Sequence, residues 1–170
     1  AINIFNEVKS EISNGTEKNL KVINIKVEEK PTGEISAGAG IGTDGGTVAF
    51  SVTENNWLGE GKNLNFEVEY DKESLAGTVN FTNPNYDFLG NAINYYIGSS
   101  SNDKPDQGYE NTVITSGVNT SFEQYKNIFA SIGLNFAFDD LRTTDTASSA
   151  LKKQSGEFSE ISADYGLKYD

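Results

Sequence analysis

The chain has 170 residues, a formal net charge of −12, and no His, Cys or Met. The absence of His and Cys excludes Ser-His-Asp and Cys-His catalysis, thiolate and imidazole metal sites, and a disulfide framework. The acidic balance argues against nucleic acid as a partner, because neutralising phosphates requires clustered Lys and Arg.

Residues 1–30 differ in pattern from the rest of the chain. Two stretches, at 3–12 and 20–29, predict strands joined by a polar turn, and Lys and Glu are frequent in both. We therefore expect residues 1–30 to be the last hairpin of a small soluble α+β module. Residues 31–33, Pro-Thr-Gly, predict a linker, because Pro and Gly end strands.

The stretch 34–42 predicts a glycine-loaded strand. Strict alternation places Ile35, Ala37, Ala39 and Ile41 on one face. The other face has almost no side chains and consists of Glu34, Ser36, Gly38, Gly40 and Gly42. Glycine weakens the interior of a strand, so this strand is expected to pack and pair weakly and to open readily.

Seven further strands are predicted by the same alternation. They cover about 47–53, 63–70, 74–82, 90–99, 110–119, 127–138 and 160–169, and the pattern of 110–119 is the least clear. Their connections are of two kinds. Those at 43–46, 71–73, 99–108 and 139–156 are polar, whereas those at 55–62, 83–90 and 120–126 are short and contain Trp57, Tyr86, Phe88, Phe122 and Tyr125. Polar loops at one end and aromatic turns at the other are typical of an outer-membrane barrel.

Alternation alone does not separate a membrane barrel from a soluble β-sandwich, because each sandwich sheet also packs one face into a core. No apolar run in the chain approaches the roughly 20 residues of a transmembrane helix, so a closed barrel is the means of spanning a bilayer that remains. Two features favour the barrel. The polar face contains charges, namely Glu67, Glu69, Glu160, Asp164 and Lys168, and aromatic residues end several strands, namely Tyr70, Phe81, Phe138 and Tyr169.

A series of motifs over 20–90 resembles the BamA family of outer-membrane barrel-assembly proteins. A strand at 20–30 precedes Thr32-Gly33, the Gly-rich strand, and the turn Asp44-Gly45-Gly46. The turn Asn56-Trp57-Leu58-Gly59-Glu60-Gly61 and the turn Thr82-Asn83-Pro84 follow. Over 90–170 the resemblance is limited to the order and spacing of the predicted strands.

The resemblance implies a domain organisation and a fold. Residues 1–30 would be the C-terminal part of a POTRA domain, 31–33 a linker, and 34–170 the N-terminal half of the family's sixteen-stranded barrel. The expected fold is all-β: about eight strands of an antiparallel up-and-down transmembrane barrel after a POTRA hairpin. The chain is then expected to be an internal fragment, in keeping with its lack of Met.

The resemblance also implies a function without catalysis or cofactor: assembly and insertion of barrel proteins into the outer membrane. The first barrel strand would form one side of a lateral gate and pair with an incoming strand through its backbone. The implied gate residues are Ile35, Ser36, Ala37, Gly38, Ala39, Gly40 and Ile41. Trp57 would anchor the periplasmic interface, and Asp44, Gly45, Gly46, Gly59, Gly61 and Pro84 would shape the turns.

The partners that the resemblance implies are unfolded outer-membrane proteins, accessory lipoproteins of the assembly complex, and outer-membrane lipid with lipopolysaccharide. Residues 1–30 would be periplasmic. Two alternatives stay open at this point. One is a two-partner-secretion or autotransporter-assembly barrel, and the other is a soluble β-sandwich binding module.

Overall fold

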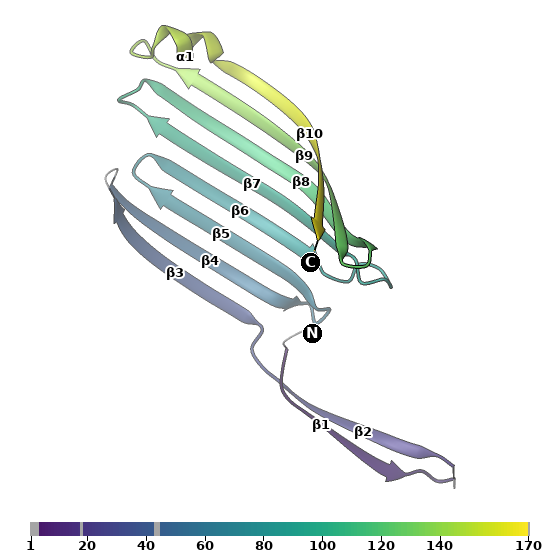
Figure 1. The fold of residues 1–170 in the computed structure, drawn as a ribbon. Helices are drawn as coiled ribbons and strands as arrows, with labels where there is room; N and C mark the ends of the chain where they lie inside the picture. Colours follow the sequence, from purple (N-terminus) through teal and green to yellow (C-terminus); the bar gives the residue numbers. More distant parts are fainter. Residues whose placement is uncertain (1–3, 18, 43–44, 170) are drawn as a thin grey trace.

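The computed structural model describes residues 4–17, 19–42 and 45–169, which form two antiparallel sheets (Figure 1). A two-stranded hairpin contains β1 (Phe5–Asn14) and β2 (Lys21–Glu29). The larger sheet contains β3 (Gly33–Gly42), β4 (Gly45–Trp57), β5 (Lys62–Asp71), β6 (Ser74–Asn83), β7 (Ala92–Lys104), β8 (Tyr109–Tyr125), β9 (Ile128–Thr143) and β10 (Gly156–Tyr169). The strands of this sheet lie side by side in chain order, and the hairpin extends away below β3 and β4 (Figure 1).

The eight-stranded sheet has the up-and-down topology that the sequence predicts. Each strand from β3 to β10 pairs antiparallel with the next strand in the chain. Among the described residues β3 and β10 are the two edges, so this sheet is curved and open and not a closed barrel. The all-β fold of eight antiparallel strands is confirmed.

The strand registers separate a polar face from an apolar face, because residues paired across strands lie on the same side of a sheet. One row across the polar face consists of Glu34, Thr53, Asn65, Asn80, Tyr96, Gly117, Asn135 and Ser162. The adjacent row on the apolar face consists of Ile35, Val52, Phe66, Val79, Ile97, Ser116, Phe136 and Ile161. The two faces are therefore continuous over all eight strands.

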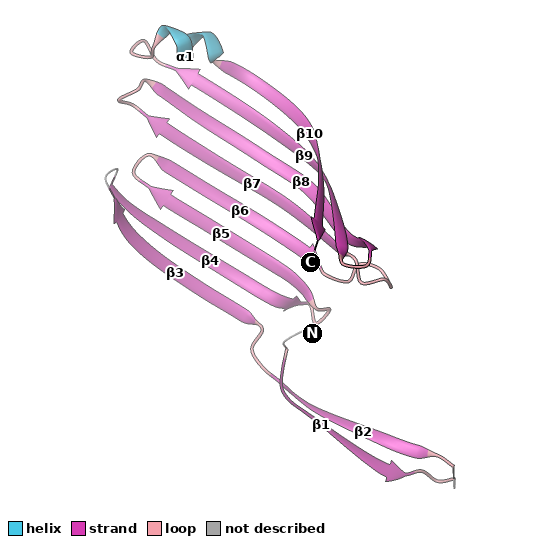
Figure 2. Cartoon of the chain, viewed as in Figure 1, coloured by secondary structure: helices cyan, strands magenta, loops and turns pink. Residues whose placement is uncertain are grey.

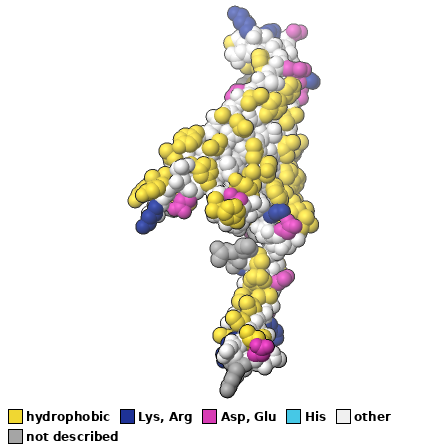
Figure 3. Space-filling view, turned by 90° about the vertical axis from the view of Figure 1, so that its right-hand side faces the viewer, with side chains coloured by type: hydrophobic (Ala, Val, Ile, Leu, Met, Phe, Trp, Pro, Cys, Tyr) yellow, Lys and Arg dark blue, Asp and Glu magenta, His cyan; other side chains and the backbone are white. Residues whose placement is uncertain are grey.

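Within the described residues, no second layer packs against the apolar face. Ala130 and Ala147 are the buried hydrophobic residues of the described part, whereas Ile132 and Phe136 remain 46% and 41% exposed. On the side seen in Figure 3, hydrophobic side chains cover the middle of the sheet and charged ones gather toward its ends. The β-sandwich alternative is wrong, because it requires two sheets enclosing a dry core.

Several predicted loops are in fact strand. β7 continues to Lys104, β8 continues to Tyr125, and β9 continues to Thr143. Polar residues there pair with each other, as Ser101 does with Thr112. The predicted connections at 99–108, 120–126 and 139–156 are therefore too long, because backbone ladders extend beyond the apolar band.

The connection between β9 and β10 contains a helix, α1 (Ser149–Gln154), that the sequence pattern did not predict (Figure 2). Ser148 caps it by accepting a hydrogen bond from the Leu151 amide. The same connection contacts the β7–β8 turn, where Thr144 N donates a hydrogen bond to Gly108 O at 2.8 Å. Among the described residues, no helix is long and apolar enough to cross a membrane.

Candidate functional site

Strand β3 forms one edge of the eight-stranded sheet and directly follows the hairpin (Figure 1). It pairs with β4 without a bulge from Gly33 to Gly42, and its other side has no pairing strand among the described residues. Its apolar face is the one predicted, and the two isoleucines at its ends are 72% (Ile35) and 96% (Ile41) exposed. The predicted gate residues thus lie together on one unpaired edge.

The polar face of β3 has no side chains from Gly38 to the end of the strand. A Cβ atom added at Gly38, Gly40 or Gly42 would have no heavy atom within 4 Å among the described residues. The residues opposite them on β4 are also small: Ala49 faces Gly38, and Thr47 faces Gly40. Strand β3 is therefore held to the sheet chiefly by its backbone ladder.

The predicted turn after β3 is shorter than expected. Gly45 and Gly46 already belong to β4, where they pair with Gly42 and Ile41. Gly45 has a φ of +121°, a backbone conformation that favours glycine. Asp44, the remaining member of this predicted turn, lies outside the described residues.

The turn between β4 and β5 contains three of the predicted site residues. Trp57 ends β4, where the pairing with β5 is irregular, and its side chain is 40% exposed. Gly59 and Gly61 have left-handed φ values of +75° and +66°, which glycine adopts without steric cost. Asn56 closes the turn: its Oδ1 accepts from Gly61 N at 2.7 Å.

The turn between β6 and β7 begins at Pro84 and is organised by Asp87. The Asp87 carboxylate accepts hydrogen bonds from Leu89 N at 3.0 Å and from Asn91 through both its amide N, at 3.0 Å, and its Nδ2, at 2.7 Å. Partial desolvation opposes ionisation of Asp87, but these hydrogen bonds outweigh it and lower its pKa. The ordered turn presents Phe88, which is 97% exposed.

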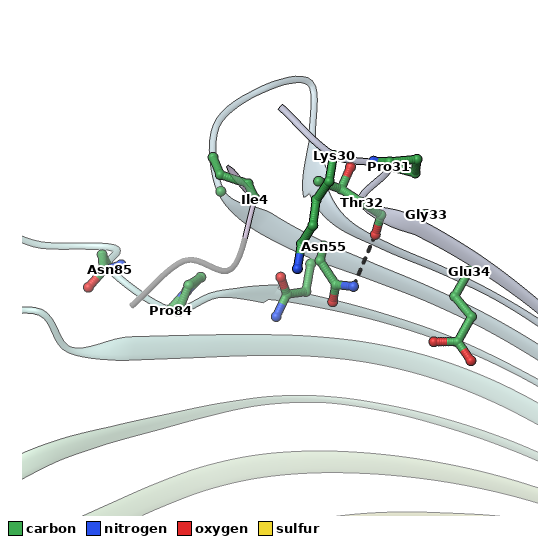
Figure 4. Close-up of a pocket in the computed structure, with 11 residues that line it drawn as sticks. Ile4, Lys30, Pro31, Thr32, Gly33, Glu34, Asn55, Pro84 and Asn85 are labelled. Atoms are coloured by element: carbon green, nitrogen blue, oxygen red, sulfur yellow. Dashed lines mark hydrogen bonds between the residues drawn. The ribbon is translucent and has the colours of Figure 1, made fainter. Parts of the chain in front are cut away.

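A half-open pocket of about 840 Å³ lies at the junction between hairpin and sheet (Figure 4). Its lining combines the linker and the adjacent sheet: Ile4, Lys30, Pro31, Thr32, Gly33, Glu34, Asn55, Gly61, Asn63, Pro84 and Asn85. The main contact across the junction is made by Asn55, whose amide N and Nδ2 both donate to the Thr32 carbonyl, at 3.1 and 3.0 Å. Thr32 and Asn55 were not predicted as site residues, because this contact depends on the pairing of residues 23 positions apart.

A second cluster, on the polar face of β7–β10, was also not predicted. Tyr96 Oη donates to Asn135 Oδ1 at 2.9 Å, and Asn135 Nδ2 donates to the Asp164 carboxylate. Gly117 lies beneath this contact, where an added Cβ would be 2.5 Å from Tyr96 Cε1. We call Tyr96, Gly117, Asn135 and Asp164 the polar-face cluster; it links four successive strands.

The chemistry available at these sites is hydrogen bonding and apolar contact. Within the part of the chain that the structure describes, no three Asp or Glu side chains are grouped to hold a metal ion. The groups that β3 offers a ligand are backbone N–H and C=O groups. An unpaired row of such groups is a template for another strand.

Comparison with known proteins agrees with this architecture. Residues 56–170 match the Omp85 superfamily domain. The chain is 26% identical over 116 residues to the outer membrane protein assembly factor BamA of Neisseria meningitidis serogroup B. That match covers 68% of this chain but 13% of the relative, so the chain spans a small part of that protein's length.

A solved structure shows the same fold over nearly the whole chain. The crystal structure of BamA from Haemophilus ducreyi lacking POTRA domains 1–3 superposes with a TM-score of 0.76 at 20% identity. The superposition covers 99% of this chain and 36% of that one. The resemblance inferred from the motifs is confirmed.

Proposed function

Because the chain belongs to the Omp85 superfamily, we propose that it is part of an outer-membrane protein that assembles and inserts other β-barrel proteins. Strand β3 is the proposed templating edge, and it forms one side of a lateral gate. The similarity to the outer membrane protein assembly factor of Neisseria meningitidis favours assembly over the two-partner-secretion or autotransporter-assembly alternative. Residues 1–30 are then the end of a periplasmic POTRA domain.

The observation that carries this proposal is the unprotected edge of β3. Natural sheets blunt their edges with charges, prolines, bulges or short strands. Strand β3 has ten residues, no proline, no bulge, and Glu34 as its one charged residue. Such an edge accepts a strand through main-chain hydrogen bonds, which give affinity without reading the partner's sequence.

The environment strengthens that capture. In the hydrocarbon layer an unpaired backbone group has no water to bond, and leaving it unpaired costs several kcal/mol. The exposed Ile35 and Ile41 would hold the strand in the lipid while its backbone pairs with the incoming strand. The process makes and breaks no covalent bond, so the proposed function is not enzymatic and needs no cofactor.

The proposed partners follow from this mechanism. Unfolded outer-membrane proteins supply the incoming strands, and outer-membrane lipid with lipopolysaccharide surrounds the apolar face. The exposed aromatic residues of the turns, with Trp57 as the proposed anchor, would lie at the periplasmic interface. Accessory lipoproteins would bind the periplasmic domain.

Site-specific photo-crosslinking in the full-length protein tests the templating edge. A photoreactive residue replaces Ala39 in β3 or, as the matched control, Val79 in β6, which also lies on the apolar face but is paired on both sides. During assembly of a barrel substrate, Ala39 should form adducts with the substrate and Val79 should not. Equal adduct yields from both positions would refute the proposal.

A disulfide lock tests the gate. A cysteine at Ser36 and one in the last strand of the full-length barrel would hold the proposed gate closed. We expect insertion of substrates to stop under oxidation and to resume after reduction. Insertion that continues at the same rate in the locked protein would rule out a lateral gate at β3.

A further inference from the structure

The small side chains in the second half of β3 do little to fix its register against β4. From Gly38 to Gly42 its partners are Ala49, Val48, Thr47, Gly46 and Gly45. Register is weakly specified in Gly-rich strands, which are prone to slip. A slip of two residues would also leave every side chain on its present face. The feature that fixes this register must therefore lie outside 38–42.

The contact between Thr32 and Asn55 has a geometry that can fix the register of β3 against β4. Gly33 pairs with Glu54, so Thr32 and Asn55 are the next positions in the same register. The Asn55 backbone N–H continues the ladder to the Thr32 carbonyl at 3.1 Å, and Asn55 Nδ2 donates to that same oxygen at 3.0 Å (Figure 4). Any slip would separate this carbonyl from both donors.

Glu54 adds a second, independent tie. Its carboxylate lies near enough to interact with the Thr32 side chain and accepts a hydrogen bond from Asn56 N at 2.7 Å. It lies against Gly33, where an added Cβ would be 3.2 Å from Glu54 Oε2. The glycine at position 33 therefore leaves room for the carboxylate beside the backbone, and this arrangement exists in one register.

We propose that Thr32, Glu54 and Asn55 form a register clasp, which holds the junction end of β3 in one alignment with β4. Among the described residues, the side chains of β3 beyond the clasp form no hydrogen bond with β4, so this part of the strand can flex without slipping. The use of the clasp rests on the proposed function: an incoming strand would pair with backbone groups whose positions the clasp sets. These three are positioning residues.

Disulfide trapping in the full-length protein, in a cysteine-free background, measures the register directly. Ser36→Cys with Ser51→Cys reports the observed pairing. Ser36→Cys with Ala49→Cys, or with Thr53→Cys, reports a slip of two residues in either direction. The clasp is weakened by Thr32→Val together with Asn55→Ala, which removes the Thr32 hydroxyl beside Glu54 and the Asn55 Nδ2 hydrogen bond to the Thr32 carbonyl. The slipped products should then rise about tenfold.

The matched control is Asn65→Ala, which removes the Asn65 Nδ2 to Thr53 Oγ1 hydrogen bond of 3.0 Å between β4 and β5. There the larger pairs Val52–Phe66 and Phe50–Val68 set the register, so slipped products at β3 should stay at the wild-type yield. Slipped products that stay at that yield in the double variant would overturn the clasp. An equal rise in the control would also overturn it.

Substrate assembly is measured separately on the same variants. Slipped disulfides together with reduced assembly support both the clasp and the templating edge. Slipped disulfides with unchanged assembly leave the clasp standing and refute templating by β3. Heat-dependent gel mobility of each variant confirms that its barrel has folded before trapping, and a second, milder variant, Asn55→Ala alone, should give an intermediate yield of slipped product.

Discussion

Glycines occupy the polar face at both ends of the eight-stranded sheet, but their surroundings are opposite. In β3 the space above Gly38, Gly40 and Gly42 is open. In β8 to β10, neighbouring polar side chains fill the space above Gly117, Gly133 and Gly166. Glycine therefore leaves the polar face of β3 open, whereas in β8–β10 it makes room for polar side chains from neighbouring strands.

The two regions also differ in strand length. Strand β3 has 10 residues, close to the roughly 9–11 that a tilted transmembrane strand needs, whereas β8 and β9 have 17 and 16. The longer ladders add backbone hydrogen bonds and cross-strand contacts. Together with the polar-face cluster they tie β7–β10 to one another through side chains, whereas no side chain fills the space above Gly38, Gly40 and Gly42 of β3 among the described residues.

The largest expected effect comes from filling the space above a covered glycine. In Gly117→Ala the new Cβ would lie 2.5 Å from Tyr96 Cε1 and 2.6 Å from Asn135 Oδ1. We expect a loss of about 1–3 kcal/mol in the free energy of unfolding, the range for overpacking. Urea unfolding of the full-length protein in lipid measures it. Gly77→Ala, whose Cβ would make ordinary contacts of 3.7 Å or more, is the control and should lose far less.

The next effect isolates the hydrogen bond of the polar-face cluster. Tyr96→Phe removes the donor to Asn135 while keeping the ring above Gly117. The free energy of unfolding should fall by about 1 kcal/mol. Tyr95→Phe is the matched control, since Tyr95 lies on the apolar face against Phe81. Equal losses in both variants would mean that the hydroxyl contact does not stiffen β7–β10.

Gly38→Ala should have the opposite sign. An alanine meets nothing within 4 Å there and lowers the conformational entropy of the unfolded chain. The full-length protein should gain about 0.5 kcal/mol in its free energy of unfolding in the same urea titration. If assembly needs a pliable edge, assembly activity should nonetheless fall. A loss of stability instead would show that another part of the full-length protein packs on this face.

The sequence predicted the strands and faces well because a period of two is a local property. The row from Ile35 to Phe136 is apolar on the predicted side in every strand except at Ser116. Strand ends were missed where polar pairs such as Ser101–Thr112 continue the ladder, since polarity there looks like a loop. Helix α1 was missed because six residues are too few to show a helical period.

The sequence predicted where strand β3 lies in the chain, but not the side-chain contacts between strands. The Gly-rich pattern predicted strand β3, and the family resemblance implied that it is the first strand of the barrel, at an edge. The clasp and the polar-face cluster depend on which residues face each other across strands, as Tyr96 and Asn135 do across Gly117. A sequence shows that Gly117 is small, but not that a tyrosine from β7 lies over it.

The smallest expected effect concerns the β6–β7 turn. It distinguishes the stability of a connection from that of the strands. Hydrogen bonds to the ionised Asp87 lower its pKa in the folded protein, so they stabilise the β6–β7 turn above the unfolded-state pKa of about 4. This stabilisation is lost as the pH falls through the lowered folded-state pKa. Hydrogen exchange of the Leu89 and Asn91 amides should therefore speed up in acid, relative to the intrinsic rate, while amides of β8 and β9 keep their protection. Asp87→Asn should remove the pH dependence, and a variant that keeps it would assign the effect to another group.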